Sequence, residues 1–209
     1  MPHWATPHRA ADLQVPARIA LLSVILLVAA GCGISQKSFV PTETDQDPAR
    51  RLPGVQFFED KASHIPGTER ANYDRFPPTG GPHDLTWAEC TGTVYEVAVR
   101  NENMVHSLEH GAVWIAYDPQ RISGEALQDL VKRVQGQPYT MLSPYPDLPA
   151  PISLQAWGHQ LRVDNADDSR IDHFLQALRS NPYTSPEAGS PCEAYPGAFD
   201  PANPPVLGS

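Results

Sequence analysis

One almost entirely apolar run limits what this chain can fold into. Residues 111–118 read GAVWIAYD, with six consecutive apolar residues between the terminal Gly and Asp. A strand of this composition has to be covered on both faces, so we expect it at the centre of a sheet. Further strands are predicted over 92–99, 139–145 and 152–163, each rich in β-branched or aromatic residues. Gly158, inside the last of these, is interpreted as a bulge.

Two other segments have the periodicity of amphipathic helices. Residues 123–135 begin with Ser123, a favourable N-cap, and carry apolar residues at spacings of three and four. Residues 169–180 repeat this pattern. The order strand, strand, helix, strand, strand, helix predicts an α+β fold in a single small domain. We expect a mixed or antiparallel sheet of about four to five strands with both helices packed on one face.

The first 31 residues have the layout of a secretory signal peptide. Arg9 and Arg18 precede a twelve-residue apolar run, 19–30, that ends in small residues. The run is too short for a comfortable transmembrane helix. It leads into AAGC, ending at Cys32, which resembles the lipobox of bacterial lipoproteins. This resemblance implies acylation of Cys32 and anchoring to the cell membrane on its extracytoplasmic face. The alternative is ordinary cleavage that leaves Cys32 free.

The segments on either side of the periodic region are rich in proline. Residues 32–55 are polar and proline-interrupted, so we interpret them as a lipid-anchored flexible tether. The folded domain is expected over 56–181, and 182–209 is predicted to be an irregular, proline-rich tail.

The sequence contains three cysteines, and one of them is expected to have a different role from the other two. If Cys32 carries lipid, Cys90 and Cys192 remain, and outside the cytosol these two are expected to form a disulfide. The alternative is that Cys90 is a thiolate ligand. The formal net charge of −9 argues against a nucleic-acid partner, because such binding depends on Lys and Arg neutralising phosphates.

The motif HSLEH, residues 106–110, is the strongest indication of chemistry. A helical turn and an extended chain would both place His106 and His110 on one side. His83 follows the bend PPTGGP and is expected to fold over that side. Met104 and Met141 are the two methionines of the predicted mature chain.

These residues predict a transition-metal site. Imidazole suits copper and zinc, and thioethers select Cu(I), so a His/Met cluster favours copper first and zinc second. The predicted ligands are listed here: His83, His106, His110, Met104 and Met141. Glu109 is expected to orient an imidazole from outside the ligand set. The alternative is structural: His106 bonds a backbone carbonyl and His110 caps the entry to a strand.

HSLEH also fits the H-x-x-E-H pattern of some zinc proteases. In those enzymes a helix presents two histidines to zinc and the glutamate to a water. Here the motif runs directly into Gly111 and an apolar strand, which leaves no room for a long helix. We therefore do not expect a hydrolase.

Several blocks of the sequence together resemble one protein family. PPTGGPH, Cys90, VHSLEHGAVWIAYDP and LPAPISLQAWGHQL look like DUF3105, a family of uncharacterised bacterial extracytoplasmic proteins. The resemblance covers roughly residues 55–180 and implies no settled activity. It draws attention to His83, His106, Glu109 and His110, which lie in its two histidine-bearing blocks.

The sequence as a whole predicts a cell-surface lipoprotein that captures or delivers a transition metal rather than an enzyme. The competing hypothesis is a module without metal that binds a protein partner in the cell envelope.

Overall fold

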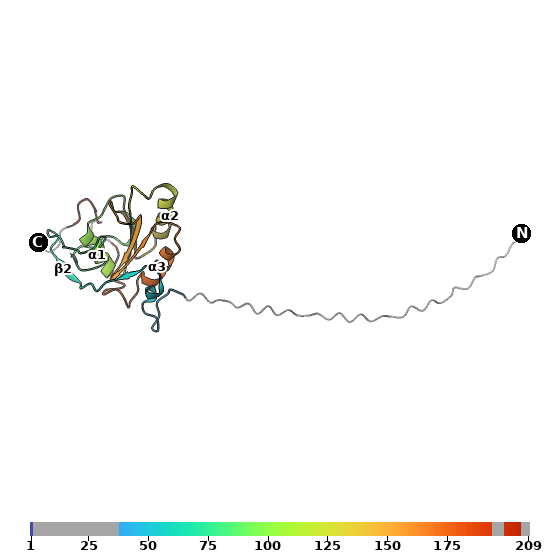
Figure 1. Cartoon of the computed structure of the whole chain (residues 1–209), viewed down its shortest axis with the longest axis horizontal. Coiled ribbons are helices and arrows are strands. Elements are labelled where there is room, and N and C mark those ends of the chain that lie inside the picture. The colour runs from blue at the N-terminus through green and yellow to red at the C-terminus, as the bar shows by residue number, and fades with distance from the viewer. Residues whose placement is uncertain (2–37, 194–198, 206–209) are drawn as a thin grey trace. The chain divides into compact units, whose positions relative to one another are not determined.

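The computed structural model describes residue 1, residues 38–193 and residues 199–205 (Figure 1). The fold below is that of the unit Lys37–Ser209. The predicted signal peptide and the predicted acylation site at Cys32 lie outside the described residues. Within the part of the chain that the structure describes, no helix has both the length and the apolarity needed to cross a bilayer.

The domain is built on a six-stranded mixed sheet with the strand order β1-β8-β7-β5-β6-β4. The strands are β1 (Gln56–Phe57), β4 (Thr91–Val94), β5 (Val113–Tyr117), β6 (Thr140–Pro144), β7 (Ile152–Ala156) and β8 (His159–Val163). β5 runs parallel to β6 and antiparallel to β7, and all five of its residues are buried. The predicted central, doubly covered strand is confirmed.

The side chains of β5 alternate between two apolar layers. Val113 and Ile115 pack in one cluster with residues of α2 (Gly124–Val134) and α3 (Arg170–Leu178). Trp114 packs in the other cluster with Met104 and Leu108 of α1 (Asn101–Glu109). Because strand side chains point alternately to opposite faces, one strand can complete two cores. The sheet thus lies between α1 on one side and α2 and α3 on the other (Figure 1).

The expected α+β single domain is confirmed, and the sheet and helices are more extensive than predicted. Among the described residues there is a six-stranded mixed sheet, a separate two-stranded sheet and three helices. The additional helix is α1. It escaped the pattern analysis because it has no polar face: Glu102, Asn103 and Ser107 are buried together with its apolar residues. A helix buried all round gives no amphipathic signal.

The predicted strand 152–163 is two strands joined by a tight turn. β7 and β8 pair antiparallel, with Ala156 opposite His159. Gly158 has φ of +68°, and a Cβ placed there would lie 2.8 Å from the carbonyl oxygen of Phe58. Glycine is therefore required by a hairpin turn and by a close backbone approach, and the predicted bulge is wrong.

The flanking segments are held to the domain more closely than a tether and a free tail would be. Pro48–Arg51 forms a short 3-10 helix, η1, and Ala49 and Leu52 join the core cluster beneath α3. In the C-terminal segment, a disulfide joins Cys192 to Cys90. This bond confirms the expected pairing.

Removing the disulfide should destabilise the domain strongly. The bond links residues 102 positions apart, and a loop of that length corresponds to about 4–5 kcal/mol of unfolding free energy in the chain-entropy account. The measurement is urea unfolding of a Cys90→Ala/Cys192→Ala variant beside the oxidised wild type. Wild type under reducing conditions is the matched control and should unfold at the variant's midpoint. An unchanged midpoint in the variant would contradict the expectation.

Candidate metal centre

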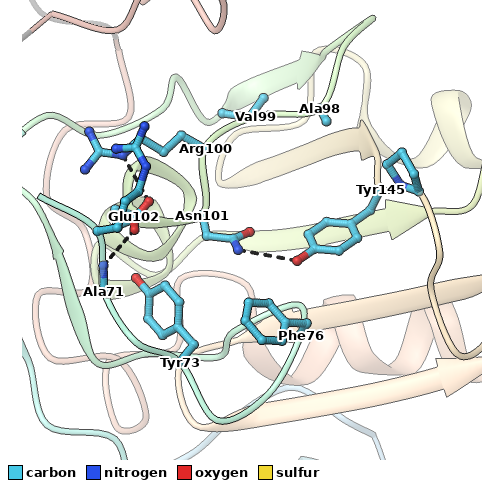
Figure 2. Close-up of a pocket in the computed structure, with 11 residues that line it drawn as sticks. Ala71, Tyr73, Phe76, Ala98, Val99, Arg100, Asn101, Glu102 and Tyr145 are labelled. Atoms are coloured by element: carbon cyan, nitrogen blue, oxygen red, sulfur yellow. Dashed lines mark hydrogen bonds and ion pairs between the residues drawn. The ribbon is translucent and has the colours of Figure 1, made fainter. Parts of the chain in front are cut away.

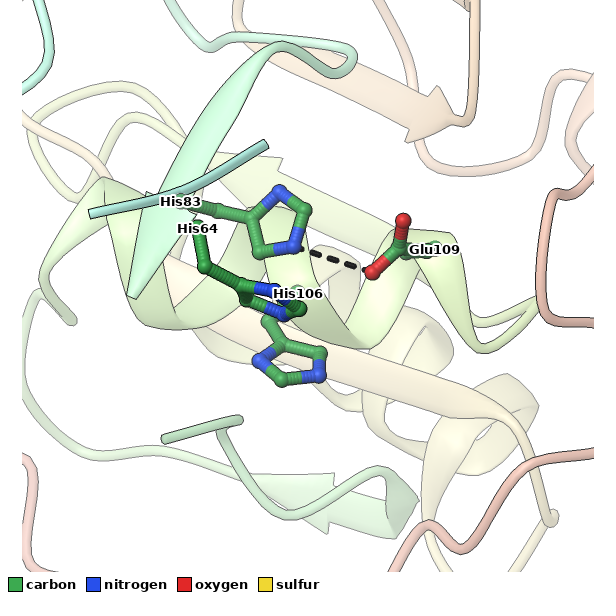
Figure 3. A group of neighbouring side chains, drawn as sticks. All are labelled: His64, His83, His106 and Glu109. Atoms are coloured by element: carbon green, nitrogen blue, oxygen red, sulfur yellow. Dashed lines mark ion pairs between the residues drawn. The ribbon is translucent and has the colours of Figure 1, made fainter. Parts of the chain in front are cut away.

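Three histidines and a glutamate converge where a small sheet meets the last turn of α1. The small sheet consists of β2 (Ser63–Ile65) and β3 (Pro82–Asp84), which run parallel with His64 opposite His83. His106 and Glu109 are three residues apart on α1 and so share one face of the helix. One ligand atom from each of these four residues lies within 4.8 Å of the others. Figure 3 shows the four side chains pointing toward one another. We call them the His/Glu group.

Backbone carbonyls fix the tautomers of two of these imidazoles. The Nδ1 of His83 lies 2.8 Å from the carbonyl oxygen of Gly81, and the Nδ1 of His106 lies 2.7 Å from that of Asp84. A carbonyl can only accept, so each Nδ1 carries the hydrogen and donates it. In the neutral rings each Nε2 then keeps its lone pair. Histidines that bind metals have their second nitrogen held in this way.

The Nε2 of His83 faces the carboxylate of Glu109. The Nε2 and Oε2 atoms are 2.9 Å apart, but their geometry is not that of a hydrogen bond, and each is buried without a hydrogen-bond partner. Two electron-pair donors that face each other in a buried space need a proton or a cation between them. The orphaned atoms therefore fit a bound cation.

The electrostatics keep the His106 imidazole neutral and the Glu109 carboxylate charged. Burial, with smaller contributions from His110 and His83, lowers the pKa of His106 to about 3. Burial alone would raise the pKa of Glu109, but the neighbouring imidazoles, His83 first, outweigh burial and lower it. Neutral imidazoles and an ionised carboxylate are the forms that bind metal ions.

Two sets of contacts hold the group in place. Arg100, at the start of α1, pairs with the buried Asp84 of β3, with 2.6 Å between Nη1 and Oδ2. At the other end of α1, the amides of Glu187 and Gly189 each donate a 3.0 Å hydrogen bond, to the carbonyl oxygens of Glu109 and His110 respectively. These bonds satisfy carbonyls that a helix end leaves without partners. Both ends of α1 are thereby fixed against the segments that surround the site.

The structure brings together only some of the residues proposed from the sequence. His83, His106 and Glu109 meet, with Glu109 inside the group rather than behind it. The ring of His110 lies 4.6 Å from that of His106, but its Nδ1 donates to the carbonyl of Pro191. The methionines Met104 and Met141 are fully buried in the apolar cluster between α1 and the sheet.

His64 was missed by the sequence analysis. It lies in a segment without clear periodicity, and its proximity to His83 comes from the parallel pairing of two three-residue strands. No local pattern signals such a pairing. The structural alternative predicted that His106 bonds a backbone carbonyl, and its Nδ1 does so. That bond leaves the Nε2 of the same ring available as a ligand.

HSLEH lies at the C-terminal end of a short helix, which is one of the two conformations considered from the sequence. α1 spans nine residues and ends at Glu109, with His110 as its C-cap, and the chain then bends at Gly111, which has φ of +99°. In the protease pattern both histidines would bind zinc and the glutamate would act on water. Here Glu109 joins His106 in the group, while His110 is directed to the C-terminal segment.

A metal ion would require modest shifts of the ligand atoms. Ligand atoms about 2.0–2.1 Å from a tetrahedral ion lie about 3.4 Å apart, which is less than the 4.8 Å limit seen here and more than the 2.9 Å between His83 Nε2 and Glu109 Oε2. His64 is the exposed member of the group and lies on an edge strand.

A separate cavity lies beside the other end of α1. Figure 2 shows it between the aromatic rings of Tyr73, Phe76 and Tyr145, and its volume is about 450 Å³. No member of the His/Glu group lines it. Its wall nevertheless touches β3, because the Tyr73 hydroxyl donates a 2.6 Å hydrogen bond to the carbonyl of Pro82.

Comparison with known proteins identifies one matching protein family. The family model for DUF3105, a protein family of unknown function, matches residues 64–194. The match includes the whole His/Glu group and both disulfide cysteines. No curated protein and no solved structure shows significant similarity to the chain. This chain belongs to the DUF3105 family.

Proposed function

We propose that this protein binds a transition-metal ion through His64, His83, His106 and Glu109, for capture or delivery of the metal. The observation that carries the proposal is the approach of His83 Nε2 and Glu109 Oε2 to 2.9 Å, both buried and without hydrogen-bond partners. A metal ion bound to both atoms would satisfy their lone pairs, with the two atoms moving apart toward about 3.4 Å in a tetrahedral site. The imidazole of His106 adds a third donor, and the exposed His64 closes the site from the solvent side.

The donor set bears on which metal is bound. Three imidazoles and one carboxylate suit Cu(II) and Zn(II), whereas a thioether would have favoured Cu(I). Cu(II) stands above Zn(II) in intrinsic affinity for such ligands. Our order therefore stays copper first and zinc second. The preference for copper now rests on imidazole nitrogen, since Met104 and Met141 pack among apolar side chains.

We further propose that the protein acts outside the cytoplasm as a lipoprotein. The support is the signal-peptide pattern, the lipobox-like AAGC ending at Cys32, and the Cys90–Cys192 disulfide, since such bonds persist mainly in oxidising compartments. Two or more acyl chains at Cys32 would hold the protein firmly at the membrane.

The second hypothesis is a module that binds an envelope protein and no metal. The observation in its favour is the aromatic cavity of Figure 2, which lies away from the His/Glu group. Metal titration separates the two hypotheses, because only a ligand that binds the folded state raises its stability. A zinc hydrolase of the H-x-x-E-H type is the least favoured alternative, since Glu109 faces an imidazole rather than an open position.

Replacing His64 should weaken metal binding without unfolding the protein, because its side chain is exposed. We expect His64→Ala to lower the affinity for Cu(II) and Zn(II) by at least the roughly 10- to 100-fold that loss of an outer partner of a ligand costs. The full chain without a histidine tag would be titrated against a chromophoric chelator. Thermal unfolding with and without metal would be followed in parallel.

His173→Ala is the matched control, since His173 stacks on Phe39 away from the site. It should bind metal as wild type does. At a metal concentration 100 times the dissociation constant, wild type should gain about 2.7 kcal/mol of unfolding free energy. If neither metal stabilises wild type, or if His64→Ala and His173→Ala bind equally well, the proposed site is wrong.

The metal-free protein should lose stability as the pH falls from about 6.5 toward 3. The pKa of His106 is 6.5 in the unfolded reference and about 3 in the fold, so between these values the unfolded chain binds the extra proton. Protonation then favours unfolding, with a slope of up to about 1.4 kcal/mol per pH unit for this group. The lowered pKa of His110 acts in the same direction.

The measurement is urea unfolding of the metal-free wild type and of His106→Gln at pH 7, 6, 5 and 4. The variant should be less stable at pH 7 but lose less stability on acidification. Parallel curves for the two proteins would contradict this account of the site's electrostatics.

A further inference from the structure

We propose a second, weaker cation position beside the His/Glu group, formed by His110 and Glu187. It rests on the proposed function, in that it extends a metal-binding site to a second ion. His110 belongs to HSLEH but not to the His/Glu group. Its ring nevertheless lies 4.6 Å from that of His106, so the second position would directly adjoin the first.

The geometry of His110 is that of a prepared ligand. Its Nδ1 lies 2.7 Å from the carbonyl oxygen of Pro191, so Nδ1 carries the hydrogen and the neutral ring presents a lone pair at Nε2. The residue is 3% exposed, and its Nε2 faces the half-exposed side chain of Glu187. A backbone carbonyl holds His83 and His106 in the same tautomer.

The Glu187 carboxylate lies close to the distance expected of a second ligand. Its Oε2 is 3.9 Å from the Nε2 of His110, which is too long for a hydrogen bond. Two ligand atoms that each lie about 2.0–2.2 Å from one tetrahedral ion are separated by about 3.3–3.6 Å. The two atoms would therefore have to approach each other by a few tenths of an ångström to share an ion.

The backbone around Glu187 places the carboxylate there. The Glu187 amide donates to the carbonyl of Glu109, and the Gly189 amide donates to that of His110, each at 3.0 Å. Three residues later, the disulfide ties Cys192 to Cys90. The segment that carries Glu187 is thus fastened to the end of α1 at several points, while the Glu187 side chain itself is half exposed.

The second position should be weaker than the first for two reasons. It offers two protein ligands where the His/Glu group offers four, and the remaining positions would go to water. The first ion also repels the second, since one carboxylate in each position does not cancel two divalent charges. Filling should therefore be sequential, with the buried group first.

The test is the metal stoichiometry of the full, oxidised, untagged chain with Zn(II) as the probe. Native mass spectrometry and calorimetric titration should give two equivalents for wild type, with the second bound at least tenfold more weakly. Glu187→Gln should lower the affinity for the second equivalent alone. The loss should be about tenfold or more, because removing even an outer partner of a metal ligand costs about that much. His110→Asn keeps a donor for Pro191 and should abolish the second equivalent while leaving the first.

Glu193→Gln is the matched control, because it removes the same charge from the same C-terminal segment and should leave both equivalents unchanged. A single equivalent in wild type, or a second equivalent that survives both Glu187→Gln and His110→Asn, would overturn the second position. In that case the first equivalent, and its loss in His64→Ala, would still support the proposed function. If wild type binds no zinc or copper at all, both proposals fall together.

Discussion

The buried ion pair between Arg100 and Asp84 joins the two elements from which the candidate metal centre is built. Arg100 precedes α1, Asp84 ends β3, and their charged atoms meet at 2.6 Å with the carboxylate fully buried. The main chain of Asp84 accepts from His106, and its other carboxylate oxygen accepts from the amide of Thr86. Loss of the Arg100 charge would leave a buried carboxylate unpaired, a change that typically costs about 3–5 kcal/mol. The positions of His83 and His106 therefore depend on a contact in which neither residue takes part.

The same arrangement explains how a histidine can be structural and available as a ligand at once. His83, His106 and His110 each use Nδ1 to hold a backbone carbonyl, at Gly81, Asp84 and Pro191 respectively. These bonds fix the rings and the tautomers, and a neutral ring so fixed has its lone pair at Nε2. The structural role of these histidines therefore uses Nδ1, and the proposed metal-binding role would use Nε2 of the same rings.

The sequence was sufficient for features with a local signal and insufficient for those that arise from distant pairing. The apolar run around Ile115 predicted the central strand, and the periodicities of α2 and α3 predicted those helices. Two of the three histidines and the glutamate of the site could also be named, because they stand in compact motifs. α1 was not recognised, since its polar residues are buried among neighbours from other parts of the chain. His64 could not be found, because only the β2–β3 pairing brings it to His83.

The C-terminal segment gives the site a dependence on redox conditions that the His/Glu group alone would not have. Its amides satisfy the carbonyls of Glu109 and His110, and its Pro191 carbonyl fixes the His110 ring. Cys192 follows directly and is bonded to Cys90, which precedes β4 in the body of the domain. Reduction would leave the segment held by hydrogen bonds alone, and if it moved away the end of α1 would lose its hydrogen-bond partners. A helix end without such partners frays, and Glu109 lies in that last turn. We therefore expect the disulfide to stabilise the fold and also to keep Glu109, a proposed metal ligand, in place.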